Sequence, residues 1–333
     1  MPETVIITGG TGYVGQHIIG QLLANGYTVV AIVRSPVTRL NLIKQFDSPF
    51  LLSEVVDQLD KPKSIDFVLK VHHEATVFIA AATVTKFDAQ DQEKEVLNPG
   101  LAIIENTLES IKHHGKQIKR VILTSSGVTM TGIENANGLG AKYSDDDWSP
   151  LTFEDGKKDG WSAYFVSKKI NEQLAWKFME EKKPHFDLVS INPTLCLGPT
   201  EFRNEVSLDQ LPSTTSIVGS LLKLHKDSYV PELACGAIDV RDVARVHVAV
   251  INNPKAAGQR LLLEAYKATN PNILYDIRKN FPELDAKLPD LAPSPESEVK
   301  APNDARTREI LGIEQYEYTL EQSVVDLVKQ ILK

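Results

Sequence analysis

The sequence has little cysteine and no excess of basic charge. Only two of its 333 residues are Cys, Cys196 and Cys235, so neither a disulfide framework nor a cysteine-rich metal site is expected. The acidic run 145–147 lacks the alternating spacing of a calcium loop, and we expect no metal. The formal net charge of −8 lacks the basic character of nucleic-acid-binding proteins, and we expect no nucleic-acid partner.

Long apolar runs are also missing. No run approaches the roughly 20 residues that a membrane helix needs, and the first strand pattern begins within the first few residues, leaving no room for a signal peptide. We therefore expect a cytoplasmic protein that does not bind membranes. The apolar content of 42% is ordinary for a globular fold.

The clearest motif is the N-terminal stretch 4–15. Residues 4–8 predict a strand and residues 16–25 an amphipathic helix, with a glycine-rich turn between them. The pattern G-x-G-x-x-G fits glycines at 10, 12 and 15, and a second reading uses 9, 12 and 15. Such a loop brings a pyrophosphate onto the backbone N–H groups of a helix start; the alternative is a turn that needs only positive φ. The predicted cofactor-binding residues here are Thr8, Gly9, Gly10, Thr11, Gly12, Tyr13, Val14 and Gly15.

The ends of the next strands carry further candidates. The strand predicted over 27–34 ends in Arg34, where this fold meets the adenosine ribose, and a guanidinium suits the 2′-phosphate of NADPH; a solvated charge is the alternative. Arg39 lies slightly further on. The strand predicted over 50–57 ends in Asp57, a candidate partner for the adenine. The strand predicted over 76–82 ends in small residues that let a cofactor lie close: Ala80, Ala81 and Ala82.

Strand patterns continue at 120–127 and 186–192, with helical patterns between them. This alternation predicts an α/β fold with a Rossmann-type doubly wound parallel sheet. We expect residues 1–192, together with about 237–252, to form the NADP-binding domain. Residues 193–236 and 253–333 are then expected to form a smaller α/β lobe that binds substrate.

Polar residues of two segments are candidates for catalysis. The strand 120–127 ends in the hydroxyls of Thr124, Ser125 and Ser126, at the strand end where such sheets bind ligands. Tyr164 and Lys168 are four residues apart, on one face of a predicted helix. A second Y-x-x-x-K occurs at 275–279, but only the first follows the hydroxyl-tipped strand and precedes another strand.

Together these motifs resemble the extended short-chain dehydrogenase/reductases, and most of all the dihydroflavonol 4-reductase-like branch with its fungal NADPH-dependent ketone, aldehyde and methylglyoxal reductases. The resemblance rests on Thr8-Gly9-x-x-Gly12-x-x-Gly15, Thr124-Ser125-Ser126, Tyr164-x-x-x-Lys168 and Asn192-Pro193-x-x-x-x-Gly198-Pro199. It implies that NADPH reduces an aldehyde or ketone, a small-molecule substrate, to an alcohol.

The same resemblance assigns roles to single residues. Ser126, rather than Ser125, polarises the carbonyl, Tyr164 donates the proton, and Lys168 lowers the pKa of the tyrosine. The resemblance also places the following residues at the cofactor: Arg34, Arg39, Asp57, Gln58, Thr124, Tyr164, Lys168, Pro193, Leu195, Cys196 and Thr214. Three positions depart from the family pattern, namely Thr38, Ile79 and Ala102.

The expected pocket is apolar, with Val128, Thr131 and Trp161 as candidate walls, although a tryptophan is equally common in an ordinary core. We expect a monomer or homodimer. A nucleotide-sugar epimerase or dehydratase shares the Tyr–Lys pair, but dehydratases usually carry an Asp-Glu pair where this chain has Ser125 and Ser126. A non-catalytic NADP-binding redox sensor is the other alternative; such proteins typically lose the tyrosine that is present here.

Overall fold

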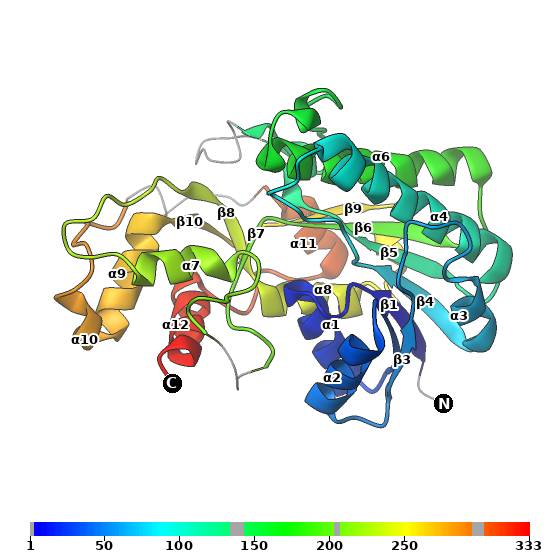
Figure 1. Ribbon diagram of the computed structural model, residues 1–333, viewed down its shortest axis with the longest axis horizontal. Coiled ribbons are helices and arrows are strands. Elements are labelled where there is room, and N and C mark those ends of the chain that lie inside the picture. Colours follow the sequence, from blue (N-terminus) through cyan, green and yellow to red (C-terminus); the bar gives the residue numbers. More distant parts are fainter. Residues whose placement is uncertain (1–2, 134–142, 203–206, 295–302) are drawn as a thin grey trace.

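The computed structural model describes residues 3–133, 143–202, 207–294 and 303–333. Its main element is a seven-stranded sheet in the order β3-β2-β1-β4-β5-β6-β9, in which all neighbours are parallel (Figure 1). The strand order reverses between β1 and β4, which is where Rossmann-type sheets bind ligands. The predicted fold class is therefore confirmed. The strands are β1 (Thr4–Thr8), β2 (Thr28–Val33), β3 (Leu51–Val55), β4 (Ala75–Ala80), β5 (Arg120–Thr124), β6 (Asp187–Pro193) and β9 (Arg260–Leu263).

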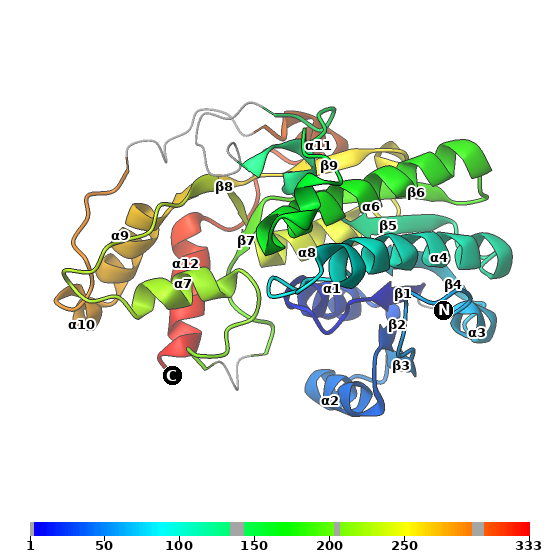
Figure 2. The same ribbon diagram turned by 45° about the horizontal axis from the view of Figure 1, so that its top comes forward.

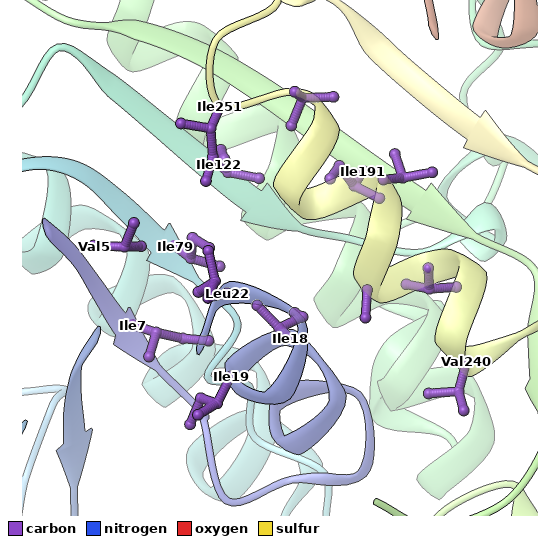
Figure 3. Packing of buried hydrophobic residues seen from close by; sticks show 14 of the residues in the cluster. Val5, Ile7, Ile18, Ile19, Leu22, Ile79, Ile122, Ile191, Val240 and Ile251 are labelled. Carbon is purple, nitrogen blue, oxygen red and sulfur yellow. The ribbon is translucent and has the colours of Figure 1, made fainter. Parts of the chain in front are cut away.

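Two layers of helices cover the faces of this sheet because successive strand residues point to opposite sides. Val5 and Ile7 belong to the core on one face, whereas Ile6 belongs to the core on the other. Figure 3 shows Ile18, Ile19 and Leu22 of α1 packing against the first of these cores. The helices on that face are α1 (Tyr13–Ala24), α2 (Pro36–Phe46), α8 (Val240–Ala249) and α11 (Ala305–Leu311). The helices on the other face are α3 (Asp66–Val71), α4 (Asn98–His114) and α6 (Gly160–Lys182).

A second, three-stranded sheet has the order β10-β8-β7 and forms a separate lobe beside the large one (Figure 1). Its core contains buried residues of three helices and of all three strands, and Leu284 of a fourth helix packs against it. The sequence patterns did not predict β7, β10, α7 or α10. The strands are β7 (Leu195–Leu197), β8 (Ala234–Asp239) and β10 (Tyr266–Thr269), and the helices are α7 (Thr215–Leu222), α9 (Asn270–Asn280), α10 (Pro282–Asp285) and α12 (Leu320–Ile331).

The structure corrects one part of the predicted domain division. Residues 260–263 and α11 were assigned to the smaller lobe, but residues 260–263 form β9 and pair with β6 in the large sheet, and α11 packs against the core of that sheet. Burial explains this: Leu261 and Leu263 complete the core that also holds α1 and α8. Within the described ranges, no helix combines the length and the apolar character needed to cross a bilayer.

Candidate active site

The glycine turn after β1 is shaped by close backbone contacts. Gly9 has φ +73°, and a Cβ there would lie 2.6 Å from the backbone of Ala81 at the end of β4. A Cβ on Gly15 would lie only 2.1 Å from the carbonyl oxygen of Gly9. A Cβ on Gly10 would instead meet the end of a flexible side chain, Ile19 Cδ1, which can move aside. The structure therefore favours the reading of the motif with glycines at 9, 12 and 15.

The start of α1 has the features of an anion-binding site. Gly12 precedes the helix; the first turn has no acidic residue, and no side chain among the described residues caps it. Its first N–H groups thus carry the positive end of the helix dipole. A Cβ on Gly12 would meet only the Gly9 carbonyl, at 3.3 Å. The open backbone at this turn fits a dinucleotide pyrophosphate.

Two predicted cofactor residues of this turn use their side chains to join segments of the protein. The Tyr13 hydroxyl donates to the carbonyl of Gly198 at 2.8 Å. The Thr8 hydroxyl accepts a hydrogen bond from the backbone N–H of Ala82 at 3.3 Å. Because these two hydroxyls are already hydrogen-bonded to other parts of the protein, the main chain of the turn is the part that can bind a phosphate.

The predicted adenosine side of the site is open to solvent. Arg34 follows β2 and Arg39 lies on α2; both are exposed, and in the described part of the chain neither guanidinium is ion-paired. The Thr38 hydroxyl is engaged by Ser35, whose side chain also caps α2. Asp57 and its neighbour Gln58 are exposed beyond the end of β3. Two unpaired cations therefore lie at the strand end where a ribose phosphate is expected.

The structure distinguishes the two serines that follow β5. Ser125 donates its hydroxyl to Oε2 of Glu172 at 2.5 Å. The Ser126 hydroxyl instead lies close enough to the phenol of Tyr164 to act to lower the pKa of that phenol. Ser126 is thus the serine that meets the tyrosine, a choice that spacing along the chain left open.

Lys168 lies one helical turn beyond Tyr164 and is buried. Its Nζ donates to the carbonyl of Thr124 at 3.1 Å, and burial lowers its pKa to about 8. Burial also raises the pKa of Tyr164 above its usual value. The lowering of the tyrosine pKa by Lys168 stays a prediction; burial acts against it, because desolvation disfavours the phenolate.

A buried histidine supports the end of β5 from the opposite side. His247 Nε2 lies 2.9 Å from the Thr124 hydroxyl, and its Nδ1 lies 2.8 Å from the Val243 carbonyl. Burial lowers the pKa of His247 to about 4, so the ring is neutral. Nδ1 then carries the proton toward Val243, and Nε2 accepts from the threonine.

Glu172 is a residue that the sequence reasoning missed. It is fully buried and accepts hydrogen bonds from Ser125, Asn192 Nδ2 (2.7 Å) and Arg260 Nε (2.7 Å). Arg260 in turn stacks on Trp148, with 3.7 Å from Cζ to the ring centroid. This carboxylate joins β5, β6, β9 and α6 beneath the site. The sequence did contain a signal for Glu172, because this residue lies one turn beyond Lys168 on the same helical face.

Aromatic side chains surround Tyr164. The ring of Phe87, a residue not predicted, lies 6.0 Å from the Tyr164 ring and 4.9 Å from that of Trp161. Trp161 is 63% exposed and lies at the rim. Val128 is half-buried, and Thr131 is buried with its hydroxyl on the Gly132 carbonyl.

The remaining predicted residues lie where the chain passes between the two sheets. Pro193 ends β6, and Leu195 begins β7. The Cys196 thiol is buried, which raises its pKa to about 12, and Thr214 donates its hydroxyl to the Cys196 carbonyl. The charge state of Cys196 affects the pKa of both Tyr164 and Lys168, so this thiol lies near the site.

The second Y-x-x-x-K has different surroundings. It lies on α9 in the smaller lobe, where Tyr275 is 43% exposed. Lys279 pairs with Glu321 of α12 at 2.9 Å. This pair is a surface feature, as the order of elements predicted.

Comparison with known proteins agrees with this geometry. The model of the NAD dependent epimerase/dehydratase family matches residues 5–263. The chain is 35% identical over 339 residues to the putative NADPH-dependent methylglyoxal reductase of Candida albicans, covering 99% of this chain and 98% of that protein.

Two solved structures are similar along nearly their whole length. The Candida albicans Gre2 complex with NADPH is 34% identical, with a TM-score of 0.93 and 99% of both chains covered. The yeast methylglyoxal/isovaleraldehyde reductase Gre2 with NADPH is 30% identical, with a TM-score of 0.93, covering 99% of this chain and 98% of that one. The chain therefore belongs to the NAD dependent epimerase/dehydratase family, and its resemblance to the extended short-chain dehydrogenase/reductases is confirmed.

Proposed function

We propose that the protein is an NADPH-dependent reductase that converts aldehydes or ketones to alcohols. The observation that carries this proposal is the meeting of Ser126, Tyr164 and Lys168 at the carboxyl end of β5. Relatives named as NADPH-dependent methylglyoxal reductases support both the reaction and the cofactor. The substrate is a small-molecule carbonyl compound.

The cofactor is proposed to lie across the carboxyl ends of β1, β2 and β4. NADPH, when bound, supplies the hydride. The backbone of Gly12 and the first turn of α1 would hold its pyrophosphate, and the exposed Arg34 and Arg39 would bind its 2′-phosphate. Asp57 and Gln58 would border the adenine. The preference for NADPH over NADH is supported by two guanidinium groups that lack carboxylate partners among the described residues.

Proton transfer is assigned to this chain's own side chains. Tyr164 would donate its phenolic proton to the carbonyl oxygen; its raised pKa keeps the phenol protonated at neutral pH, as a donor requires. The Ser126 hydroxyl would hold the same oxygen while charge develops there. The ammonium of Lys168, one turn away, would stabilise the phenolate that forms.

The pocket is proposed to open beside Tyr164. Phe87 and Trp161 form an aromatic edge next to the phenol, and Val128 and Thr131 follow Ser126 on the other side. An apolar wall of this kind accepts carbonyl compounds with alkyl or aromatic substituents. The smaller lobe would close the far side of the pocket.

A substrate panel tests the proposal. NADPH oxidation is followed by absorbance with methylglyoxal, branched aldehydes, diketones and bulky keto-esters. We expect turnover with several of these compounds and a higher kcat/KM with NADPH than with NADH. Purification with tightly retained NAD, epimerisation of a nucleotide sugar and no carbonyl reduction would instead indicate an epimerase.

A further inference from the structure

Ser-Pro dipeptides occur in the sequence at four places, beginning at Ser35, Ser48, Ser149 and Ser294. Proline-directed protein kinases modify serine in this dipeptide, and the structure gives the four serines different surroundings. Ser149 is 2% exposed, and Ser294 lies against α9 in the smaller lobe. Ser48 lies between α2 and β3, at the amino end of that strand. Ser35 follows the carboxyl end of β2, which is the side of the sheet where the cofactor is expected.

The segment that begins at Ser35 is open to solvent. Pro36, Val37 and Arg39 are exposed, and of the eleven residues of α2 only Leu42 is buried. Figure 2 shows α2 at the edge of the large lobe. Ser35 is half-buried, and its backbone is extended, with φ −150° and ψ 158°. A kinase can therefore approach this serine from solvent, at the start of an exposed and lightly packed helix.

The Ser35 hydroxyl is held by one neighbouring residue within the described ranges. It accepts the backbone N–H of Thr38 at 3.1 Å and lies 2.9 Å from the Thr38 hydroxyl. The first of these bonds caps α2. A phosphate on Ser35 offers three strong acceptor oxygens to the same N–H, so the modification preserves the cap.

Positive charge is concentrated around this position. Arg34 directly precedes Ser35, and the backbone N–H of Arg39 donates to the Ser35 carbonyl at 3.0 Å, so Arg39 lies at the end of the first turn of α2. Both guanidiniums are exposed and lack a carboxylate partner among the described residues. The first turn of α2 contains no acidic residue. A phosphoserine carries a charge of about −1.5 to −2, and charge-assisted hydrogen bonds to these arginines would hold it.

We propose that Ser35 is a phosphorylation site, and that its phosphate occupies the place of the 2′-phosphate of NADPH. Phosphorylation then excludes NADPH from the enzyme. This inference rests on the proposed function, which assigns Arg34 and Arg39 to the 2′-phosphate. The co-reactants are ATP and a proline-directed protein kinase. The Oγ–H bond of Ser35 breaks and an Oγ–P bond forms to the γ-phosphorus of ATP; the bond from that phosphorus to ADP breaks, and the serine proton passes to solvent.

Phosphorylation of Ser35 weakens NADPH binding in two ways. The phosphoserine occupies the two guanidiniums, and its charge repels the 2′-phosphate, which has the same sign. NADH has a hydroxyl in place of the 2′-phosphate, so its binding loses neither an ionic partner nor suffers this repulsion. Because one phosphate-binding place cannot hold both groups, bound NADPH also hinders phosphorylation of Ser35.

The test uses the full-length enzyme with phosphoserine encoded at position 35, together with three substitutions. Ser35→Asp and Ser35→Asn both keep a side chain that caps α2, and they differ by one negative charge. Ser48→Asp is the matched control, because it adds the same charge to another Ser-Pro dipeptide, beyond the opposite end of α2. The measurements are the Kd of NADPH and of NADH by fluorescence titration, kcat/KM with each cofactor, and Tm.

We expect phosphoserine at position 35 to raise the NADPH Kd about a hundredfold or more, as for the loss of two hydrogen bonds to charged groups. The NADH Kd is expected to stay near that of the wild type. Ser35→Asp adds a single charge and is expected to raise the NADPH Kd about tenfold, whereas Ser35→Asn and Ser48→Asp are expected to bind NADPH as the wild type does. The phosphoserine protein is expected to keep its Tm, because α2 stays capped.

A second measurement uses a kinase. The wild-type enzyme is incubated with a proline-directed kinase and ATP, in the presence of saturating NADPH, of NADH or of neither, and the phosphorylated peptides are quantified by mass spectrometry. We expect phosphate on Ser35, and slower modification with NADPH than with NADH. Any modification of Ser48 is the internal control, because its rate is expected to be independent of the cofactor.

The inference and the proposed function fail in different ways. If the wild-type enzyme binds NADPH no more tightly than NADH, the assignment of the 2′-phosphate is refuted, and the inference fails with it. If the wild type prefers NADPH but phosphoserine at position 35 leaves the NADPH Kd unchanged, or weakens NADH equally, the inference is overturned and the reductase function stands. Failure of the kinase to modify Ser35 also overturns it. If the phosphoserine protein does not fold, equal NADPH Kd values for Ser35→Asp and Ser35→Asn overturn the inference, and a weaker Ser35→Asp supports it.

Discussion

Glu172→Leu tests the buried network beneath the active site. The substitution removes the acceptor of Ser125 (2.5 Å), Asn192 (2.7 Å) and Arg260 (2.7 Å), and that of the Trp176 indole N–H (3.2 Å). Leucine has a similar volume, so the main effect is the loss of partners for buried donors and not a cavity.

The expected loss of stability depends on the hydrogen-bond partners that Arg260 keeps after the substitution. Breaking a buried ion pair by removing one partner usually costs about 3–5 kcal/mol. The Arg260 guanidinium retains the Thr129 hydroxyl (3.1 Å) and the carbonyls of Asp145 and Asp147, so the low end, about 3 kcal/mol, applies. At roughly 2–4 °C per kcal/mol for a large domain, we expect Tm to fall by roughly 6–12 °C in a thermal unfolding scan.

Glu321→Leu is the control for this prediction. Glu321 also pairs with a cation and an amide, Lys279 and Asn280, but it is half-exposed on α12, and such surface pairs contribute about 0–1 kcal/mol. Its Tm is expected to remain within a few degrees of wild type. A Glu172→Leu Tm within about 2 °C of wild type would show that the buried network does not hold the sheet ends together.

Three further predictions concern the cofactor and the pH dependence. Gly15→Ala places a Cβ 2.1 Å from the Gly9 carbonyl oxygen and is expected to abolish NADPH binding in a fluorescence titration. In Gly12→Ala the corresponding distance is 3.3 Å, so this variant is expected to fold normally and to bind NADPH more weakly. Equal effects of the two substitutions would contradict the packing argument. Arg34→Ala is expected to lower kcat/KM for NADPH about tenfold or more and to leave that for NADH unchanged; an equal loss for both would reject the 2′-phosphate assignment. Because the pKa of Lys168 is lowered to about 8, the positive charge of Lys168 is present below that pH and lost above it. The kcat/KM for reduction is therefore expected to fall above about pH 8. The same decline in the Lys168→Arg variant would show that another group causes it.

The local part of the fold could be predicted because its signals lie close together in the sequence. Strand, glycine turn and helix follow one another within residues 4–24, and the order of elements separated the pair at 164–168 from its copy at 275–279. The strands β7 and β10 were not predicted because they have only three and four residues. Each is stabilised by pairing with β8, which no local pattern reveals.

The parts of the site that were missed depend on contacts between distant segments. The choice between Ser125 and Ser126 follows from Glu172, which lies 47 residues beyond Ser125. Phe87 reaches Tyr164 because Gly160 lets the two segments approach; a Cβ there would lie 2.2 Å from the Phe87 carbonyl oxygen. The pKa-raising effect of burial on Tyr164 was not anticipated, because spacing shows that Lys168 is near but does not show how much water burial removes.

The most direct test of the catalytic assignment compares two tyrosines that begin the same sequence pattern. Tyr164→Phe and Tyr275→Phe each remove one hydroxyl, the first beside Ser126 and the second on the exposed face of α9. Carbonyl reduction is measured as NADPH oxidation, with the NADPH Kd determined in parallel. We predict that Tyr164→Phe loses about 10²–10⁴ in kcat, the usual contribution of general acid catalysis, at an unchanged Kd, and that Tyr275→Phe keeps wild-type activity. An active Tyr164→Phe enzyme would contradict the account.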